Sequence, residues 1–142
     1  MLAVKTYPQD YIDDCRAKMD AQLDAYKALV AAVGKTKAPA GRAAVETFEP
    51  LFFNNLVLVL DAYFMHRTRA IEGKDGNPLN EVRMLCTSIL QNKGVLAIDK
   101  TIKYRPEASV SKLDIGDEIR LDHAQFQALY EGFFAELGRR FT

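Results

Sequence analysis

The sequence contains few of the residues from which metal and redox sites are commonly built. Its 142 residues include two histidines, His66 and His123, and two cysteines, Cys15 and Cys86. No His-Glu-x-x-His, Glu-x-x-His or Cys-x-x-Cys motif occurs, so we expect no dedicated metal site and no cofactor. Each cysteine falls on an apolar helical stripe, which favours buried free thiols over a disulfide.

Short motifs for phosphate binding and nucleophilic catalysis are also absent. The chain has no Gly-x-Gly-x-x-Gly, no Walker loop and no Gly-x-Ser-x-Gly, so the common nucleotide-binding and hydrolase signatures give no lead. Any chemistry must therefore come from polar residues that folding brings together, and enzymatic activity is left open.

No long uninterrupted apolar run is present either. The first residues lack a charged region followed by a long apolar stretch, so we expect no signal peptide. Apolar runs such as Leu56–Leu60 are too short to span a bilayer. We therefore predict a cytoplasmic protein that does not associate with membranes.

The chain has no excess of either charge, because 19 lysines and arginines balance 19 acids. A general polyanion binder is normally basic, so nucleic-acid binding is disfavoured. The balance is uneven, however: segment 78–112 has a net charge of +3 and segment 113–142 has −3. Either these segments pack together and neutralise each other, which we favour, or 78–112 is a basic patch for an anionic partner.

Apolar residues recur at spacings of three and four and predict four helices in one domain covering 1–142. The first covers about 8–33 and ends at Gly34. The second covers about 50–72, where Pro50 either opens it or kinks a helix that begins near Gly41. Because its stretch from Leu51 to Phe64 is apolar around most of the helix, we expect it to be central and largely buried.

The third and fourth predicted helices have clear start signals. Asn77 is a suitable N-cap for a helix over 78–93, and Pro78 suits its first position. Asp122 and Gln125 form a capping box at the start of a helix over 123–141. Both starts are therefore expected close to these residues.

Segment 95–121, between the last two helices, is the least helical part of the sequence. Residues 109–113 and 118–121 flank a turn at 114–117 and are compatible with a hairpin. The predicted fold class is therefore mostly α: a four-helix bundle-like single domain with a small β-hairpin or irregular insert before the last helix.

Polar residues are densest around the junction of the second and third predicted helices. The candidate ligand-binding residues there are Asp61, His66, Arg67, Arg69, Asn77, Asn80, Glu81 and Arg83. On a continuous helix, one polar arc contains Asp61, His66 and Glu72 and either faces water or lines a cleft. His66 and Asp61 are five positions apart, which weakens them as a proton-transfer pair.

Arg67 is exceptional because it falls on the apolar face of its predicted helix. A buried guanidinium must be paired, since leaving it alone costs several kcal/mol. Structural pairing is the favoured outcome, with three candidate partners: Glu81, Asp75 and Glu107. The alternative is that Arg67 binds the carboxylate or phosphate of a small anionic ligand.

The function we favour is a non-catalytic binding or assembly domain, which forms a homo-oligomer and binds a small anionic ligand or a protein partner. The aromatic residues exceed what one helix face needs, so some are available for an interface. Two alternatives remain open. One is a small enzyme that uses Asp61, His66 and Arg67, and the other is a nucleic-acid-binding protein that uses the basic segment 78–112.

Overall fold

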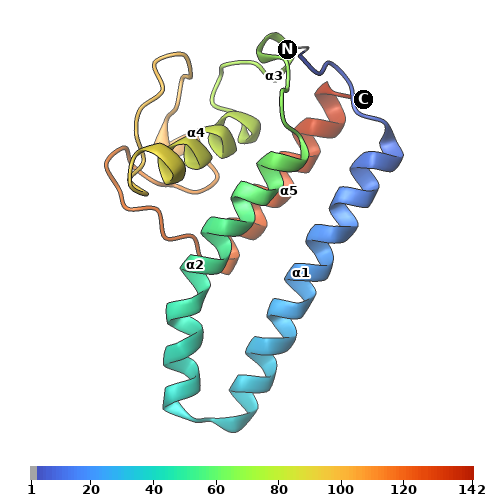
Figure 1. Cartoon of the computed structure of the whole chain (residues 1–142). Helices are drawn as coiled ribbons and strands as arrows, with labels where there is room; N and C mark the ends of the chain where they lie inside the picture. Colours follow the sequence, from blue (N-terminus) through green and yellow to red (C-terminus); the bar gives the residue numbers. More distant parts are fainter. Residues whose placement is uncertain (1–2) are drawn as a thin grey trace.

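Three long helices run side by side and form the frame of the molecule. The computed structural model describes residues 3–142, and 66% of these residues are helical. In chain order the elements are α1 (Gln9–Thr36), α2 (Pro39–Tyr63), α3 (Arg69–Glu72), α4 (Pro78–Gln91), the 3-10 turn η1 (Pro106–Ala108) and α5 (His123–Arg140). α4 lies across α2 and α5 rather than alongside them (Figure 1). The prediction of a mostly helical single domain is confirmed.

The first two helices form a long antiparallel hairpin with a very short connection. Only Lys37 and Ala38 join them, and Lys37 takes up a left-handed conformation (φ 54°) that caps α1. Pro39 occupies the first position of α2, where its missing N–H costs nothing. α1 therefore continues past Gly34, where its end was predicted. Of the two starts predicted for the second helix, the structure agrees with the one near Gly41, because α2 begins at Pro39 and Pro50 lies inside it.

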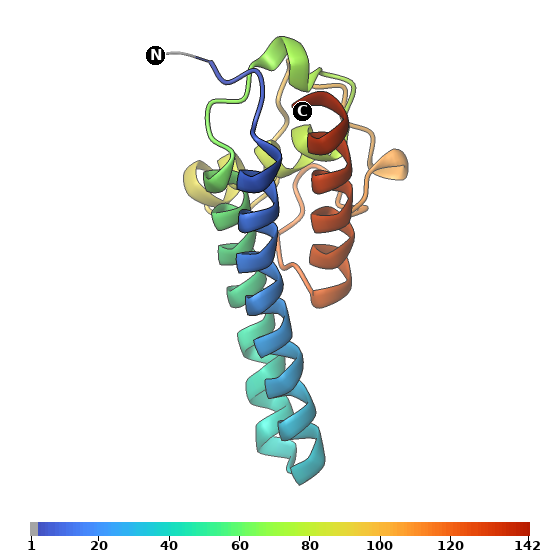
Figure 2. The ribbon, with the colours of Figure 1, turned by 90° about the vertical axis from the view of Figure 1, so that its right-hand side faces the viewer.

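α5 covers only the half of this hairpin that is remote from the turn. The ring of His123, its first residue, lies 5.3 Å from the ring of Tyr26 and 5.7 Å from that of Phe53. Further along α5, the hydroxyl of Tyr130 donates a hydrogen bond to Asp20 of α1. The half of the hairpin that contains the turn projects beyond the rest of the molecule (Figure 2).

α2 ends at Tyr63, not near Glu72 as predicted. The chain turns at 64–66, with His66 in the left-handed region (φ 62°). Val4 pairs with this segment: its N–H donates to the carbonyl of His66 at 2.7 Å, and its carbonyl accepts from the N–H of Thr68 at 2.8 Å. The predicted polar arc therefore stops at Tyr63, because the N-terminal segment pairs with the residues expected to continue the helix.

The predicted hairpin in segment 95–121 is wrong, since no strand occurs among the residues that the structure describes. Val95 and Glu118 form only an isolated bridge. The Glu81 carboxylate accepts from the backbone N–H groups of Val110 and Ser111, at 3.0 and 2.8 Å. A buried side chain of α4 thus accepts hydrogen bonds that a neighbouring strand would accept in a hairpin. The predicted alternative, an irregular insert, describes this segment.

Other local predictions agree with the structure. The Asn77 side chain accepts from the first turn of α4, and Asp122 and Gln125 form a capping box at the start of α5. Cys15 and Cys86 are free and buried, as predicted, and burial raises the pKa of the Cys86 thiol.

Candidate functional site

A buried ion-pair network joins the end of α2 to α3 and α4. Its centre is the fully buried carboxylate of Glu72. Arg67 Nε donates to it at 2.8 Å, Arg83 Nε and Nη2 at 2.9 and 2.8 Å, and Asn80 Nδ2 at 2.9 Å. The side chain of Arg67 is only 2% exposed, and its Nη1 also donates to Asp61 at 3.0 Å. The network therefore pairs two guanidinium groups with two carboxylates.

Arg67 is held by protein carboxylates, but not by those predicted. The predicted partners were Glu81, Asp75 and Glu107, and the observed ones are Glu72 and Asp61. Arg67 Nη1 also donates to the Phe64 carbonyl at 3.0 Å, close to the end of α2. The sequence pattern missed Glu72 because it placed that residue on the polar side of a continuous helix.

Opposing effects set the pKa of Glu72. Burial raises the pKa of this carboxyl group, but the hydrogen bonds and positive charges of Arg83 and Arg67 outweigh burial and hold the pKa below its usual value. The hydrogen bond to Glu72 in turn raises the pKa of Arg83. The pair stays ionised at neutral pH, unlike a general acid or base, whose pKa lies near the working pH.

The structure gathers most, but not all, of the predicted site residues. The residues around Glu72 are Asp61, Arg67, Arg69, Asn77, Asn80 and Arg83. Arg69 lies at the edge, 3.9 Å from Glu72, and its Nη2 donates to Thr101 at 3.0 Å. Two residues lie apart: His66 is exposed, and Glu81 faces the 110–111 loop. The cluster is largely an internal network.

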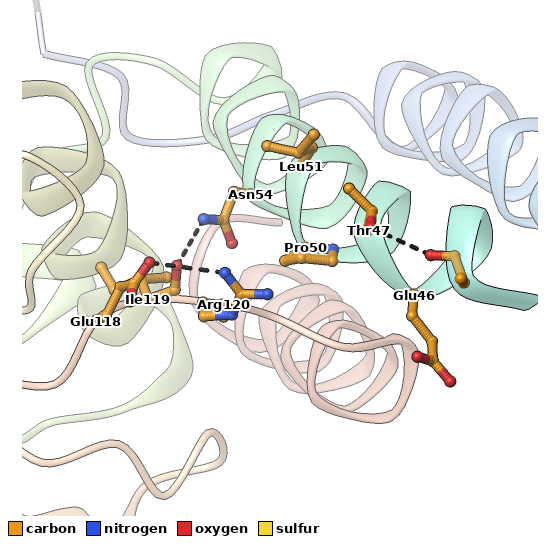
Figure 3. Close-up of a pocket in the computed structure, with 9 residues that line it drawn as sticks. Glu46, Thr47, Pro50, Leu51, Asn54, Glu118, Ile119 and Arg120 are labelled. Carbon is orange, nitrogen blue, oxygen red and sulfur yellow. Dashed lines mark hydrogen bonds and ion pairs between the residues drawn. The ribbon is translucent and has the colours of Figure 1, made fainter.

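An open cavity of about 510 Å³ lies between α2 and residues 118–120, away from this network. Figure 3 shows Asn54 reaching across from α2, where its Nδ2 donates to the carbonyl of Ile119 at 2.8 Å. The lining has one cation, Arg120, which lies 3.7 Å from Glu118, and it includes a second acid, Glu46. Two carboxylates against one paired guanidinium do not suit a small anion.

An exposed apolar surface runs along α2. Only 22% of the residues in its most apolar 18-residue stretch are buried, so the prediction of a largely buried helix is wrong. Phe48, Leu51 and Val59 are 40%, 65% and 36% exposed and follow one another at helical spacing. α2 is also long and apolar enough to cross a membrane, so the absence of membrane association stays a prediction.

α1 continues this apolar surface on the same side of the hairpin. Tyr11 and Leu29 are 40% and 46% exposed, and a cavity of about 210 Å³ lies between the two helices at Leu29 and Phe48. We use "outer face" for the exposed residues Tyr11, Ala25, Leu29, Phe48, Leu51, Asn55 and Val59. It is turned away from the side that α5 covers. Contiguous exposed apolar surfaces mark protein or membrane contacts more often than isolated residues do.

No family model matches the chain, and neither a curated protein nor a solved structure matches it significantly.

Proposed function

We propose that this chain is a non-catalytic assembly domain, which associates with a helical protein surface through the outer face of the α1–α2 hairpin. The observation that carries the proposal is the exposure of α2. Its residues from Pro50 to Leu60 include no charged side chain, yet Leu51 is 65% exposed and Val59 is 36% exposed. Water contact with such a stripe is unfavourable, and packing against another helix removes it.

The buried polar network supports the same proposal. Arg67 and Glu72 are both buried, and they bind each other. Asp61 is engaged by Arg67, which leaves the exposed His66 without that carboxylate as a free proton-transfer partner. The polar cluster is therefore better explained as a brace between α2, α3 and α4 than as a reaction centre.

Site-specific photocrosslinking in the cell of origin tests the proposal. A benzophenone amino acid replaces Leu51, and a matched control carries the same group at Lys100, an exposed position on the insert. We expect one discrete protein adduct from position 51, identified by mass spectrometry. Adding Phe48→Glu and Val59→Glu to the same chain should remove it, because both changes place charge on the outer face.

Two results would contradict the assembly function. Adducts with lipid alone would mean that the outer face lies on a membrane. Equal adducts from positions 51 and 100 would mean that the outer face has no preferred protein contact.

A further inference from the structure

The α1–α2 hairpin is electrically polarised along its length. Residues 9–26 have a net charge of −3, because they contain five aspartates and only two basic residues, Arg16 and Lys18. The aspartates are Asp10, Asp13, Asp14, Asp20 and Asp24. Residues 27–51, which form the half of the hairpin that contains the turn, have a net charge of +2, because Lys27, Lys35, Lys37 and Arg42 outnumber Glu46 and Glu49. The outer face includes residues from both regions: Tyr11 and Ala25 from the first, and Leu29 from the second.

We propose that the outer face binds the same face of a second copy of this chain, with the two hairpins antiparallel about a two-fold axis. This inference rests on the proposed assembly function and names its partner. Tyr26 stacks on Phe52 with ring centroids 5.7 Å apart, so the two residues mark one level of the hairpin. An axis at this level passes close to Leu51, the most exposed of the large apolar residues on the outer face.

Such an axis pairs opposite charges. Lys37 lies 11 residues from Tyr26 towards the turn, and Asp14 lies 12 residues from it in the other direction. At about 1.5 Å per residue, both are roughly 17 Å from the axis. Each Lys37 therefore lies level with the partner's Asp14. A parallel pair would instead align each region with the same region of the second copy, and like charges repel each other.

The size of the surface fits a dimer. Overlap about this axis extends 11 residues to each side of Tyr26, from residue 15 to residue 37, and is roughly 33 Å long, and two helices side by side are about 20 Å wide. The face then covers about 660 Å², within the roughly 600–1,000 Å² per partner of a standard interface.

A second copy explains the surface better than a lipid bilayer does. To span a bilayer, α2 would have to leave the body, which buries its residues Phe53, Leu56, Val57 and Leu60. The five aspartates of α1 lie beside it, and charged groups are costly in hydrocarbon. A second copy in the antiparallel orientation covers the apolar stripe and pairs the opposite charges together.

Sedimentation velocity of the purified full chain with charge-reversed variants tests this arrangement. Lys35→Glu with Lys37→Glu reverses the turn, and Asp13→Lys with Asp14→Lys reverses the other end. We expect each pair of changes to weaken dimerisation about tenfold or more, and the fourfold variant to return within about threefold of the original, because it restores opposite charges. A control reversal on the insert, Lys100→Glu, should leave the dissociation constant unchanged.

The outcomes distinguish failure of the proposed dimer from failure of the proposed assembly function. A monomer up to about 0.5 mM would overturn the second copy as partner, while the crosslinking at position 51 still decides on assembly. Failure of the fourfold variant to recover, with circular dichroism showing intact helices, would overturn the antiparallel arrangement. Adducts at position 51 with a different protein only would also exclude self-association.

Disulfide trapping gives a second measurement that does not depend on charge. A residue near a two-fold axis meets its own copy, so Leu51→Cys should form a covalent dimer under a mild oxidant such as copper–phenanthroline. Lys100→Cys is the matched control and should remain monomeric. The native Cys15 and Cys86 are buried and do not compete. Equal trapping of both variants would overturn the inference.

Discussion

Replacing Glu72 by glutamine removes one charge and almost no volume from the centre of the buried network. The carboxylate accepts four hydrogen bonds from Arg67, Arg83 and Asn80 at 2.8–2.9 Å. A glutamine side chain offers one oxygen, and its amide group presents further N–H donors to the guanidinium groups. Arg67, with a side chain only 2% exposed, then keeps Asp61 as its one ionic partner.

The expected loss follows from the cost of an uncompensated buried charge. Breaking a buried ion pair by removing one partner costs about 3–5 kcal/mol of unfolding free energy. For a chain of this length that corresponds to a fall in Tm of about 10 °C. Arg67→Met should cost less, because Glu72 keeps Arg83 as a charged partner at 2.8 Å.

Urea unfolding followed by circular dichroism at neutral pH measures these differences. Glu118→Gln is the matched control: its carboxylate is 68% exposed and lies 3.7 Å from Arg120. Loss of such a surface pair changes the free energy of unfolding by less than about 1 kcal/mol. If Glu72→Gln costs no more than this control, or less than Arg67→Met, Glu72 is not the centre of the network.

Other predictions use the same unfolding measurements. The pKa of Glu72 is lowered in the folded state, so its contribution is complete above its unfolded value of about 4.3 and is lost as the pH falls through the lower folded value. Acid titration should therefore destabilise the original chain more steeply than Glu72→Gln, and identical slopes would refute this. Gly76→Ala should cost about 1–3 kcal/mol, because φ is 89° and an added Cβ lies 2.5 Å from the Lys103 carbonyl oxygen. Gly138→Ala, where nothing lies within 4 Å, should gain up to about 1 kcal/mol as a helix-interior change; an equal effect at both glycines would contradict the steric argument. Asn77→Ala should cost about 1–2 kcal/mol through loss of the α4 cap, and an unchanged urea midpoint would disprove that role.

Local sequence signals predicted the parts of the fold that depend on neighbouring residues. The Asn77 cap, the capping box at Asp122 and the helical periodicity of α4 and α5 all act within one or two turns. The end of α2 could not be found in this way. It depends on Val4 pairing with His66 and Thr68, more than 60 positions away, and no periodicity carries that information.

The candidate site was predicted in composition but not in arrangement. Most of the selected polar residues do lie together, yet their central member, Glu72, was absent from the selection. An acid at the end of an amphipathic pattern resembles an ordinary exposed residue until the chain folds back. The exposed stripe on α2 was missed for a related reason. Apolar residues predict burial, but whether the chain itself or another molecule buries them depends on where α5 stops.

α5 stops beside Tyr26 and Phe53, and this has a consequence for hydrogen exchange along the hairpin. Beyond that level the two helices are held mainly by each other, and local opening takes less free energy where fewer contacts must break. Amide protons on either side of the Lys37–Ala38 turn should therefore exchange faster than those of α4. A partner on the outer face would bind only the closed form and so slow this exchange. The part of the monomer that opens most easily would then be the part that association orders most.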